Sequence, residues 1–385
     1  MDSERDYGLF RLACLLARLR NAHLIYAQNL AVFLEDCRQL GADLADPSGL
    51  FQLLEPRLRE EKRSSCRQAW KQLWVERDWQ DLAAVSFEEG ERALWPGHPD
   101  YPPGLLELRA PPAPLFYRAY LGLSPGLRVT ALAQAQERTR LCVVGSRRIG
   151  SYGLQLARDC ARCLATTDIL PVSGLAYGTD VEVQGRCHEA GMEVWAVLAG
   201  GLDQIYPQVH QGLARKLAQQ GALFSEQPPG VRARRQFFPS RNRIMTGLSS
   251  ALLVLSAALR SGTMASVQHA LDQNREIWVV PGSIYEASSA GCNNLIASGA
   301  QALIRMEELS EALRSSGLSV GRRLTQVRKP QEGQPILDLL RRQGASSPER
   351  LQDALGWDQD RLYQHLADLL LAGAIELYQG LYQLT

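Results

Sequence analysis

Positive charge is concentrated in one stretch of this chain. Residues 227–271 contain six arginines and neither Asp nor Glu, although the formal net charge of all 385 residues is only +1. Phe237 and Phe238 lie in the same run. Guanidinium groups bind phosphates and aromatic rings stack on unpaired bases, a combination typical of grooves for single-stranded nucleic acid. The candidate ligand is therefore single-stranded DNA or RNA. The candidate side chains are Arg232, Arg234, Arg235, Phe237, Arg241 and Arg243.

Two further turns contain residue types that suit a phosphate. Gly145-Ser146-Arg147-Arg148 follows an apolar run and precedes a helical pattern, so backbone N–H groups and a helix dipole can converge there. Arg147 can add forked hydrogen bonds to phosphate. A second turn begins at Ser173-Gly174. A purely structural role stays open for each turn, and so does an ion-pair or helix-end role for Arg241 or Arg243.

Short apolar runs alternate with helical patterns from residue 141 onward. This alternation predicts parallel strands that are joined by helical crossovers and buried on both faces. In such a sheet, the loops that leave the carboxyl ends of the strands line the ligand crevice. The glycine turns should therefore meet at one edge. The expected strands are residues 141–144, 169–172, 194–198, 222–225, 251–255 and 277–280.

The two ends of the chain have different patterns. Apolar periodicity predicts N-terminal helices over 9–19, 24–40 and 50–73. Eight prolines within 95–125 block regular helix and indicate an extended connector packed on the next domain. After a polar linker, three helical patterns and a hairpin around Gln379-Gly380 describe a winged helix. From residue 335 onward, the chain contains four arginines and seven acidic residues. Repulsion between these acidic residues and DNA phosphates favours protein contact over duplex binding.

The overall composition indicates a soluble, folded protein with two or three domains. Hydrophobic residues make up 45% of the chain and charged residues 22%. Neither an N-terminal leader nor an apolar run of membrane-spanning length is evident, so the expected location is the cytoplasm. Cys160 and Cys163 fall in a helical pattern and should pack rather than hold a metal. No metal or cofactor is expected.

A series of motifs resembles, in order and spacing, the bacterial DNA-processing protein A family (DprA/Smf). They are LCVVGSRRIGSYG, VSGLAYGTD, AVLAGGLDQIYP, GALFSEQPPG, FFPSRNRIMTGLS, LRSGTMAS, VVPGS and GCNNLIASGA, within residues 101–304. The resemblance implies an extended Rossmann-like domain at 83–312, a helical (SAM/HhH-like) domain at 1–82, a linker at 313–334 and a winged-helix domain at 335–385. It also implies a homodimer that binds and protects incoming single-stranded DNA and loads a RecA-type recombinase in natural transformation, without catalysis.

Carried over by motif, the resemblance assigns roles to individual residues. Gly145, Ser146 and Arg147 would hold a phosphate, and Ser173 and Gly174 would supply further backbone donors. Arg234 and its neighbours would contact the DNA backbone while Phe237 or Phe238 stacks on a base. The chain also departs from the family pattern, and the departures together remove potential acid–base groups from the crevice. The departing positions include Thr179, Gln184 and Ser256.

The rival interpretations are an enzyme and a transcription factor. Rossmann-like folds often bind nucleotides, and some cleave nucleoside monophosphates with a carboxylate that follows a glycine-rich loop. Here the helix after Ser261-Gly262-Thr263 has no acidic residue until Asp272, so a positioned carboxylate is lacking. The enzyme is therefore the less favoured alternative, and the acidic winged helix disfavours a transcription factor.

Overall fold

The chain forms two compact units, Met1–Arg323 and Leu324–Thr385. The computed structural model describes residues 2–25, 27–40, 42–119, 137–321, 334–371, 375–378 and 381–384. Within these ranges, no helix has both the length and the apolar character that a bilayer crossing requires. The first unit contains every motif that the sequence associates with nucleic acid.

The first unit begins with α-helices. They are α1 (Asp2–Asn21), α2 (Ala27–Leu40), α3 (Pro47–Leu54), α4 (Glu60–Val75) and α5 (Arg77–Glu88). The sequence predicts one helix over 50–73, but a 3-10 turn, Glu55–Arg57, separates α3 from α4. Pro56 explains the break, because it lacks the N–H that would continue α3. α5 has no counterpart in the expected pattern, and the expected domain boundary at residue 82 lies inside it.

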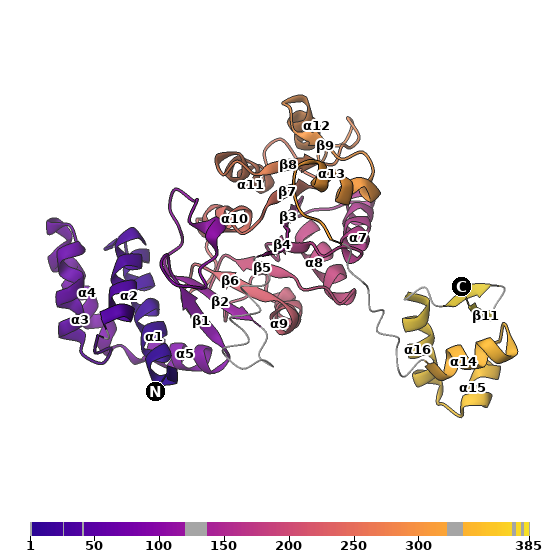
Figure 1. The fold of residues 1–385 in the computed structure, drawn as a ribbon, viewed down its shortest axis with the longest axis horizontal. Coiled ribbons are helices and arrows are strands. Elements are labelled where there is room, and N and C mark those ends of the chain that lie inside the picture. The colour runs from indigo at the N-terminus through magenta and orange to yellow at the C-terminus, as the bar shows by residue number, and fades with distance from the viewer. Residues whose placement is uncertain are drawn as a thin grey trace. The chain divides into compact units, whose positions relative to one another are not determined.

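A nine-stranded sheet follows, in the order β1-β2-β6-β5-β4-β3-β7-β8-β9 (Figure 1). All six expected strands are present. In the sheet order just given, every neighbouring pair from β6 through β3 to β9 is parallel. β1 and β2 extend the sheet antiparallel and were not predicted. β2 forms inside the proline-rich segment because its five residues, Leu115–Ala119, contain no proline. The strands are β1 (Glu91–Leu94), β2 (Leu115–Ala119), β3 (Arg140–Val144), β4 (Leu170–Ser173), β5 (Trp195–Leu198), β6 (Ala222–Ser225), β7 (Ala251–Val254), β8 (Glu276–Val279) and β9 (Gln301–Ala302).

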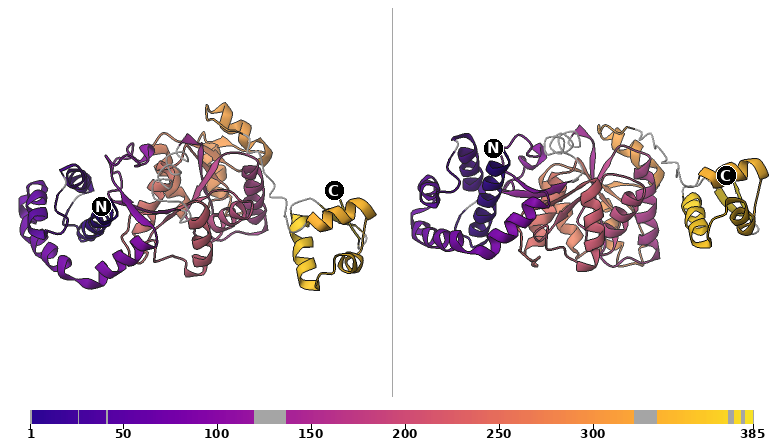
Figure 2. Two further views of the ribbon diagram at one scale, coloured as in Figure 1. Left: turned by 60° about the horizontal axis from the view of Figure 1, so that its bottom comes forward. Right: turned by 90° about the horizontal axis from the view of Figure 1, so that it is seen from below.

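Helices cover both faces of the sheet (Figures 1 and 2). α7 (Ser151–Ala165), α8 (Thr179–Glu189), α9 (Gln211–Gln220) and α13 (Leu309–Ser315) share a core with alternate β3 residues such as Val143. α10 (Phe237–Gly247), α11 (Gly262–Asp272) and α12 (Ala290–Ala297) share a second core with Cys142 and Val144. Successive side chains of a strand point to opposite faces, which places the sheet between two helical layers. The expected α/β fold with a wound parallel sheet is confirmed.

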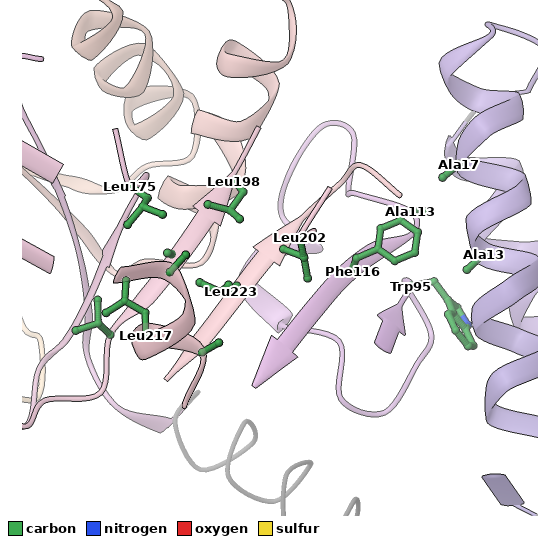
Figure 3. Packing of buried hydrophobic residues seen from close by; sticks show 14 of the residues in the cluster. Ala13, Ala17, Trp95, Ala113, Phe116, Leu175, Leu198, Leu202, Leu217 and Leu223 are labelled. Atoms are coloured by element: carbon green, nitrogen blue, oxygen red, sulfur yellow. The ribbon is translucent and has the colours of Figure 1, made fainter. Parts of the chain in front are cut away.

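The described residues of the N-terminal helices share a hydrophobic core with the sheet. Residues of α1 belong to the same buried cluster as the β2, β3 and α7 residues on one face of the sheet. The rings of Phe10 and Phe116 meet edge to face with centroids 5.8 Å apart, and Figure 3 shows Ala13 and Ala17 of α1 turned toward Phe116. Small residues on α1 let the helix approach the β1–β2 end of the sheet closely. The helical layer and the sheet therefore form one compact unit.

The second unit contains three helices and a hairpin. They are α14 (Gln334–Gln343), α15 (Pro348–Leu355), α16 (Gln359–Leu371), β10 (Ile375–Tyr378) and β11 (Leu381–Leu384). Ser346, between α14 and α15, adds an antiparallel bridge to Tyr382. Apolar residues of all three helices and of the hairpin make a core of their own. The element order is the one a winged helix requires, and that identification stays a prediction.

A carboxyl group is buried where the sheet meets the N-terminal helices. Glu91 of β1 is fully buried and pairs in register with Arg118 of β2, whose Nη2 lies 3.3 Å from Glu91 Oε2. Burial raises the pKa of Glu91 to about 8, and the Arg118 charge opposes that rise. Because the ordinary pKa is 4.5, the stability that neutral Glu91 contributes is complete below pH 4.5 and is lost as the pH rises through about 8.

We predict that Glu91→Gln flattens this pH dependence, because the amide resembles the neutral acid. The free energy of unfolding of the unsubstituted protein should fall by a few kcal/mol more than that of the variant between about pH 5 and about pH 8. Urea denaturation at the two pH values measures the difference. Glu89→Gln is the matched control, because exposed Glu89 pairs with the same arginine at 2.9 Å. An identical pH slope in Glu91→Gln would refute the assignment.

Candidate nucleic-acid interface

The loops that follow β3, β4, β5, β6 and β7 leave the carboxyl edge of the parallel strands. The chain runs from β3 through β4 and β5 to β6 on one side, then returns to β7 on the other side of β3. The reversal of strand order between β3 and β7 is the position where open α/β sheets bind ligands. Hydrogen bonds join the loops there: Ser146 N donates to Ser256 Oγ at 3.0 Å, and Thr263 Oγ1 donates to the Gly145 carbonyl at 3.0 Å.

A buried guanidinium, that of Arg241 on α10, lies beneath this edge. Its Nη1 donates to the carbonyl oxygens of Gly174, at the end of β4, and of Val197, in β5, at 2.5 and 2.7 Å. Burial lowers the pKa of Arg241, and the Asp180 carboxylate opposes that shift. Asp180 Oδ2 in turn accepts the N–H groups of Gly174 at 3.2 Å and Ala176 at 3.4 Å. Arg241 and Asp180 therefore stabilise the turn after β4 from within the protein.

These contacts determine what the turn after β4 offers to a ligand. The Gly174 N–H already donates to Asp180, and the buried Ser173 hydroxyl donates to the Val143 carbonyl at 2.7 Å. A Cβ at position 174 would collide with the Arg241 guanidinium, so a larger residue there would have to displace that buried group. The geometry gives Ser173 and Gly174 roles in holding the turn. Their expected contact with phosphate stays a prediction that these hydrogen bonds do not favour.

The turn after β3 presents an exposed arginine on an aromatic support. Arg147 is exposed, and its Cζ lies 4.8 Å from the ring centroid of Phe238, the second residue of α10. Arg241 lies over the same ring at 5.8 Å. Among the residues described, no carboxylate lies within ion-pair distance of Arg147, whereas cation–π contact restricts where its guanidinium can point. The charge is therefore available to an anion. Arg148 beside it is also exposed.

The basic loop, residues 226–236, extends the same edge after β6. Arg232, Arg234 and Arg235 are all exposed. The loop backbone rests on the turn after β5: Gly201 N donates to the Val231 carbonyl at 2.8 Å, and a Cβ at Gly200 would lie only 2.8 Å from the amide nitrogen of Ala233. The close approach of two backbones fixes the loop while its three arginine side chains face solvent.

The last turn of α1 holds the base of the basic loop. Arg18 Nη2 donates to the Pro229 carbonyl at 2.8 Å, and Arg20 Nη2 donates to the Glu226 carbonyl at 2.6 Å. Asn21 Nδ2 donates to Gln227 Oε1 at 2.8 Å. These bonds reach almost consecutive residues of the loop from a helix more than 200 residues earlier in the chain. The N-terminal helices therefore position the loop that carries the exposed arginines.

Arg243, the last arginine of the SRNR motif, is an internal ion-pair partner. Its Nη2 lies 2.7 Å from Glu226 Oε1, and its Nη1 donates to the Ala110 carbonyl at 2.7 Å. Glu226 Oε1 also receives Arg20 Nη1 at 3.1 Å. Arg243 therefore has the ion-pair role that the sequence left open for one of the two arginines. Arg241 is buried and donates to two carbonyl groups near the charge of Asp180. Both side chains are occupied inside the fold.

The structure consequently divides the twelve candidate residues into two groups. Arg147, Arg148, Arg232, Arg234 and Arg235 are exposed, and Phe237 is half-buried. The second group has internal hydrogen-bond or ion-pair partners and consists of Gly145, Ser146, Ser173, Gly174, Arg241 and Arg243.

The positions that depart from the family pattern have structural roles. The Gln184 side chain accepts the Leu175 N–H at 2.9 Å and donates to the Trp195 carbonyl at 3.1 Å. Ser256 receives the Ser146 N–H, and Thr179 Oγ1 donates to the Ser146 carbonyl at 3.3 Å. Neutral hydrogen-bonding groups thus shape the turns at all three positions.

Sequence reasoning missed two aromatic residues at this edge. Tyr177 lies in the turn after β4 and Tyr206 in the loop after β5, and both are exposed. Tyr206 meets the Phe238 ring edge to face, with centroids 6.0 Å apart. In the sequence, each of these tyrosines could have been found as an aromatic residue in the glycine-containing segment that follows an expected strand.

Comparison with known proteins gives the same family as the motifs. The model of the family described as DNA recombination-mediator protein A matches residues 92–314, more than half of the chain. The chain is 30% identical over 272 residues to a DNA processing protein DprA of Bacillus subtilis, covering 70% of this chain and 87% of that one. It is 40% identical over 173 residues to a putative DNA processing protein DprA of Mycobacterium tuberculosis, covering 44% and 43%. Protein Smf of Escherichia coli is 39% identical over 218 residues, covering 55% and 54%. The matches therefore span about half of the length of the last two relatives.

Solved structures show the same fold. An X-ray structure of DNA processing protein A from Streptococcus pneumoniae matches with a TM-score of 0.61 at 24% identity, covering 80% of this chain and 97% of that one. A structure of DNA processing protein A from Helicobacter pylori, described for its single-stranded DNA binding mode, matches with a TM-score of 0.50 at 25% identity over 59% and 97%. The matched family model, the shared motifs and the common fold agree, and this chain belongs to the DNA recombination-mediator protein A (DprA/Smf) family.

Proposed function

We propose that this protein binds single-stranded DNA along the carboxyl edge of its sheet and mediates recombination without catalysing a reaction. The observation that carries the proposal is Arg147, exposed beside the turn after β3 and resting on Phe238. A guanidinium held in this way offers a preoriented phosphate contact. The single-stranded DNA binding mode described for the H. pylori relative supports the same ligand.

The exposed arginines of the basic loop supply the rest of the electrostatic attraction. Arg232, Arg234 and Arg235, in the loop after β6, add positive charge at the same carboxyl edge of the sheet as Arg147, in the turn after β3. Cations in a row neutralise successive phosphates and release counterions, which provides affinity without sequence preference. Binding of this kind suits a protein that must accept any incoming strand.

The carboxylates at this edge argue against the enzyme alternative. Asp180 accepts two backbone amides beside buried Arg241, and Asp203 accepts the Gly230 N–H at 2.9 Å. Glu226 is shared by Arg20 and Arg243. A general base needs a carboxylate that is free to take a proton from a substrate or water. These three groups are committed to holding the loops, so a binding role fits them better than hydrolysis.

The finer functions follow from family membership and are part of the proposal. They are protection of incoming single strands, loading of a RecA-type recombinase in natural transformation, assembly as a homodimer, and action in the cytoplasm. In the second unit, the acidic balance of the chain from residue 335 onward favours a protein contact over duplex DNA.

We predict that Arg147→Ala weakens binding of an oligo-dT strand without unfolding the protein. A charge-assisted hydrogen bond contributes about 1.5 to 3 kcal/mol, so affinity should fall roughly 10- to 150-fold. Fluorescence anisotropy measures the affinity and thermal denaturation checks the fold. Arg162→Ala is the matched control, because it removes an exposed arginine from the far end of α7. Equal affinities of the Arg147 variant and the unsubstituted protein would count against the proposed site.

Replacing Arg232, Arg234 and Arg235 together by Ala should flatten the salt dependence of binding. Each lost phosphate contact removes about 0.7 from the slope of log affinity against log salt for single strands, so the slope should become shallower by up to about 2. Anisotropy titrations over a range of salt concentrations give the slope. A control with the same change in charge replaces Arg59, Arg162 and Arg186 instead. If both triple variants keep the original slope, the basic loop does not contact the strand.

A further inference from the structure

Two exposed tyrosines lie among the cationic loops. Tyr177 is 49% exposed and Tyr206 is 54% exposed. Each ring is supported by another: Tyr177 meets His210 edge to face with centroids 5.1 Å apart, and Tyr206 meets Phe238 at 6.0 Å. His210 is itself fixed, because its buried ring nitrogen Nδ1 lies 2.8 Å from the Leu175 carbonyl oxygen. Both tyrosine rings are thus held on the protein side and open to solvent.

Packing connects both tyrosines to Arg147, through the backbone for Tyr177 and through the Phe238 ring for Tyr206. Gly178, next to Tyr177, has a positive φ of 77°, and a Cβ there would lie 2.7 Å from the carbonyl carbon of Arg147. The turn after β4 therefore rests directly on the turn after β3. Tyr206 reaches Arg147 through Phe238, whose ring contacts both side chains. Arg147 thus belongs to a turn that packs against the turn of Tyr177, and its side chain shares the Phe238 ring with Tyr206.

Phe238 is poorly placed to stack on a base itself. Its side chain is half-buried, and Arg147, Arg241 and Tyr206 all lie against its ring. A base would have to displace one of these side chains, whereas Tyr177 and Tyr206 already face solvent. The Phe238 ring therefore supports other side chains, whereas the rings of Tyr177 and Tyr206 are accessible to a base.

We infer that Tyr177 and Tyr206 are stacking platforms for unpaired bases, that Arg147 holds a phosphate between them, and that Phe238 is a positioning residue for Arg147 and Tyr206. The inference rests on the proposed function and assigns base contacts to residues that the family motifs leave without a role. In a duplex both faces of each base are already stacked, so open aromatic faces select single strands. The phenol hydroxyl groups can stay in water while the ring faces meet the bases.

Abasic DNA separates stacking from phosphate binding. Tyr177→Ala and Tyr206→Ala are each expected to weaken binding of oligo-dT roughly 5- to 150-fold. Neither should change binding of a strand of equal length whose bases are replaced by abasic sites. Arg147→Ala, in contrast, should weaken binding of both strands. Anisotropy titrations of the two fluorescent strands provide all of these values.

Conservative and distant variants complete the design. Tyr206→Phe and Tyr177→Phe keep the ring and should restore oligo-dT affinity. Tyr363→Ala removes an exposed tyrosine from α16 and should change neither affinity. Unchanged oligo-dT binding by both alanine variants would overturn the inference, and so would an equal loss on the two strands, which would indicate a change in loop shape. Failure of the unsubstituted protein to bind either strand would instead refute the proposed function.

Photocrosslinking tests the contact without any substitution in the protein. Oligonucleotides that contain 5-iodouracil crosslink on irradiation to aromatic side chains stacked on the modified base. Mass spectrometry of the digested complex should find adducts at Tyr177 and Tyr206. Adducts at Phe237 or Phe238 with none at either tyrosine would overturn the inference even if a tyrosine variant failed to fold.

Discussion

The carboxyl edge of the sheet depends on one buried charge, the guanidinium of Arg241. It donates to the Gly174 and Val197 carbonyl groups, and buried Asp180 balances its charge while accepting amides from the turn after β4. A buried cation is costly unless it is paired and hydrogen-bonded. Arg241 is hydrogen-bonded to both carbonyl groups and interacts electrostatically with Asp180, so it links the ends of two strands to α10. Phe238 packs on it from α10, and exposed Arg147 lies on Phe238.

A second set of contacts joins distant parts of the chain to the same edge. Arg18, Arg20 and Asn21 at the end of α1 hold the base of the basic loop, and Glu226 links Arg20 to Arg243 of α10. The N-terminal helices thus share more than a hydrophobic core with the sheet. They determine where the loop backbone lies, and the loop backbone determines where its exposed arginines lie.

The sequence predicted the elements of the wound sheet well because each parallel strand is a short apolar run between turns, buried on both faces. It did not predict β1 and β2. β1 has only two buried residues and lies just before the proline-rich segment, and β2 lies within that segment, where the prolines indicated a connector. The interruption between α3 and α4 depends on a single Pro56, which apolar periodicity overlooks. The convergence of the glycine turns at one edge followed from topology alone.

The sequence by itself determined that arginines are concentrated within 227–271, that they follow strands of a parallel sheet, and which family the motifs resemble. Only the tertiary structure decided which of these arginines is free. Arg241 and Arg243 have the same side chain as Arg234, yet Arg241 donates to the carbonyl groups of Gly174 and Val197 near Asp180, and Arg243 forms an ion pair with Glu226. Most of those partners lie far away in the chain and come together only on folding. Residue type therefore fixes the charge, while long-range packing decides whether the protein or a ligand neutralises it.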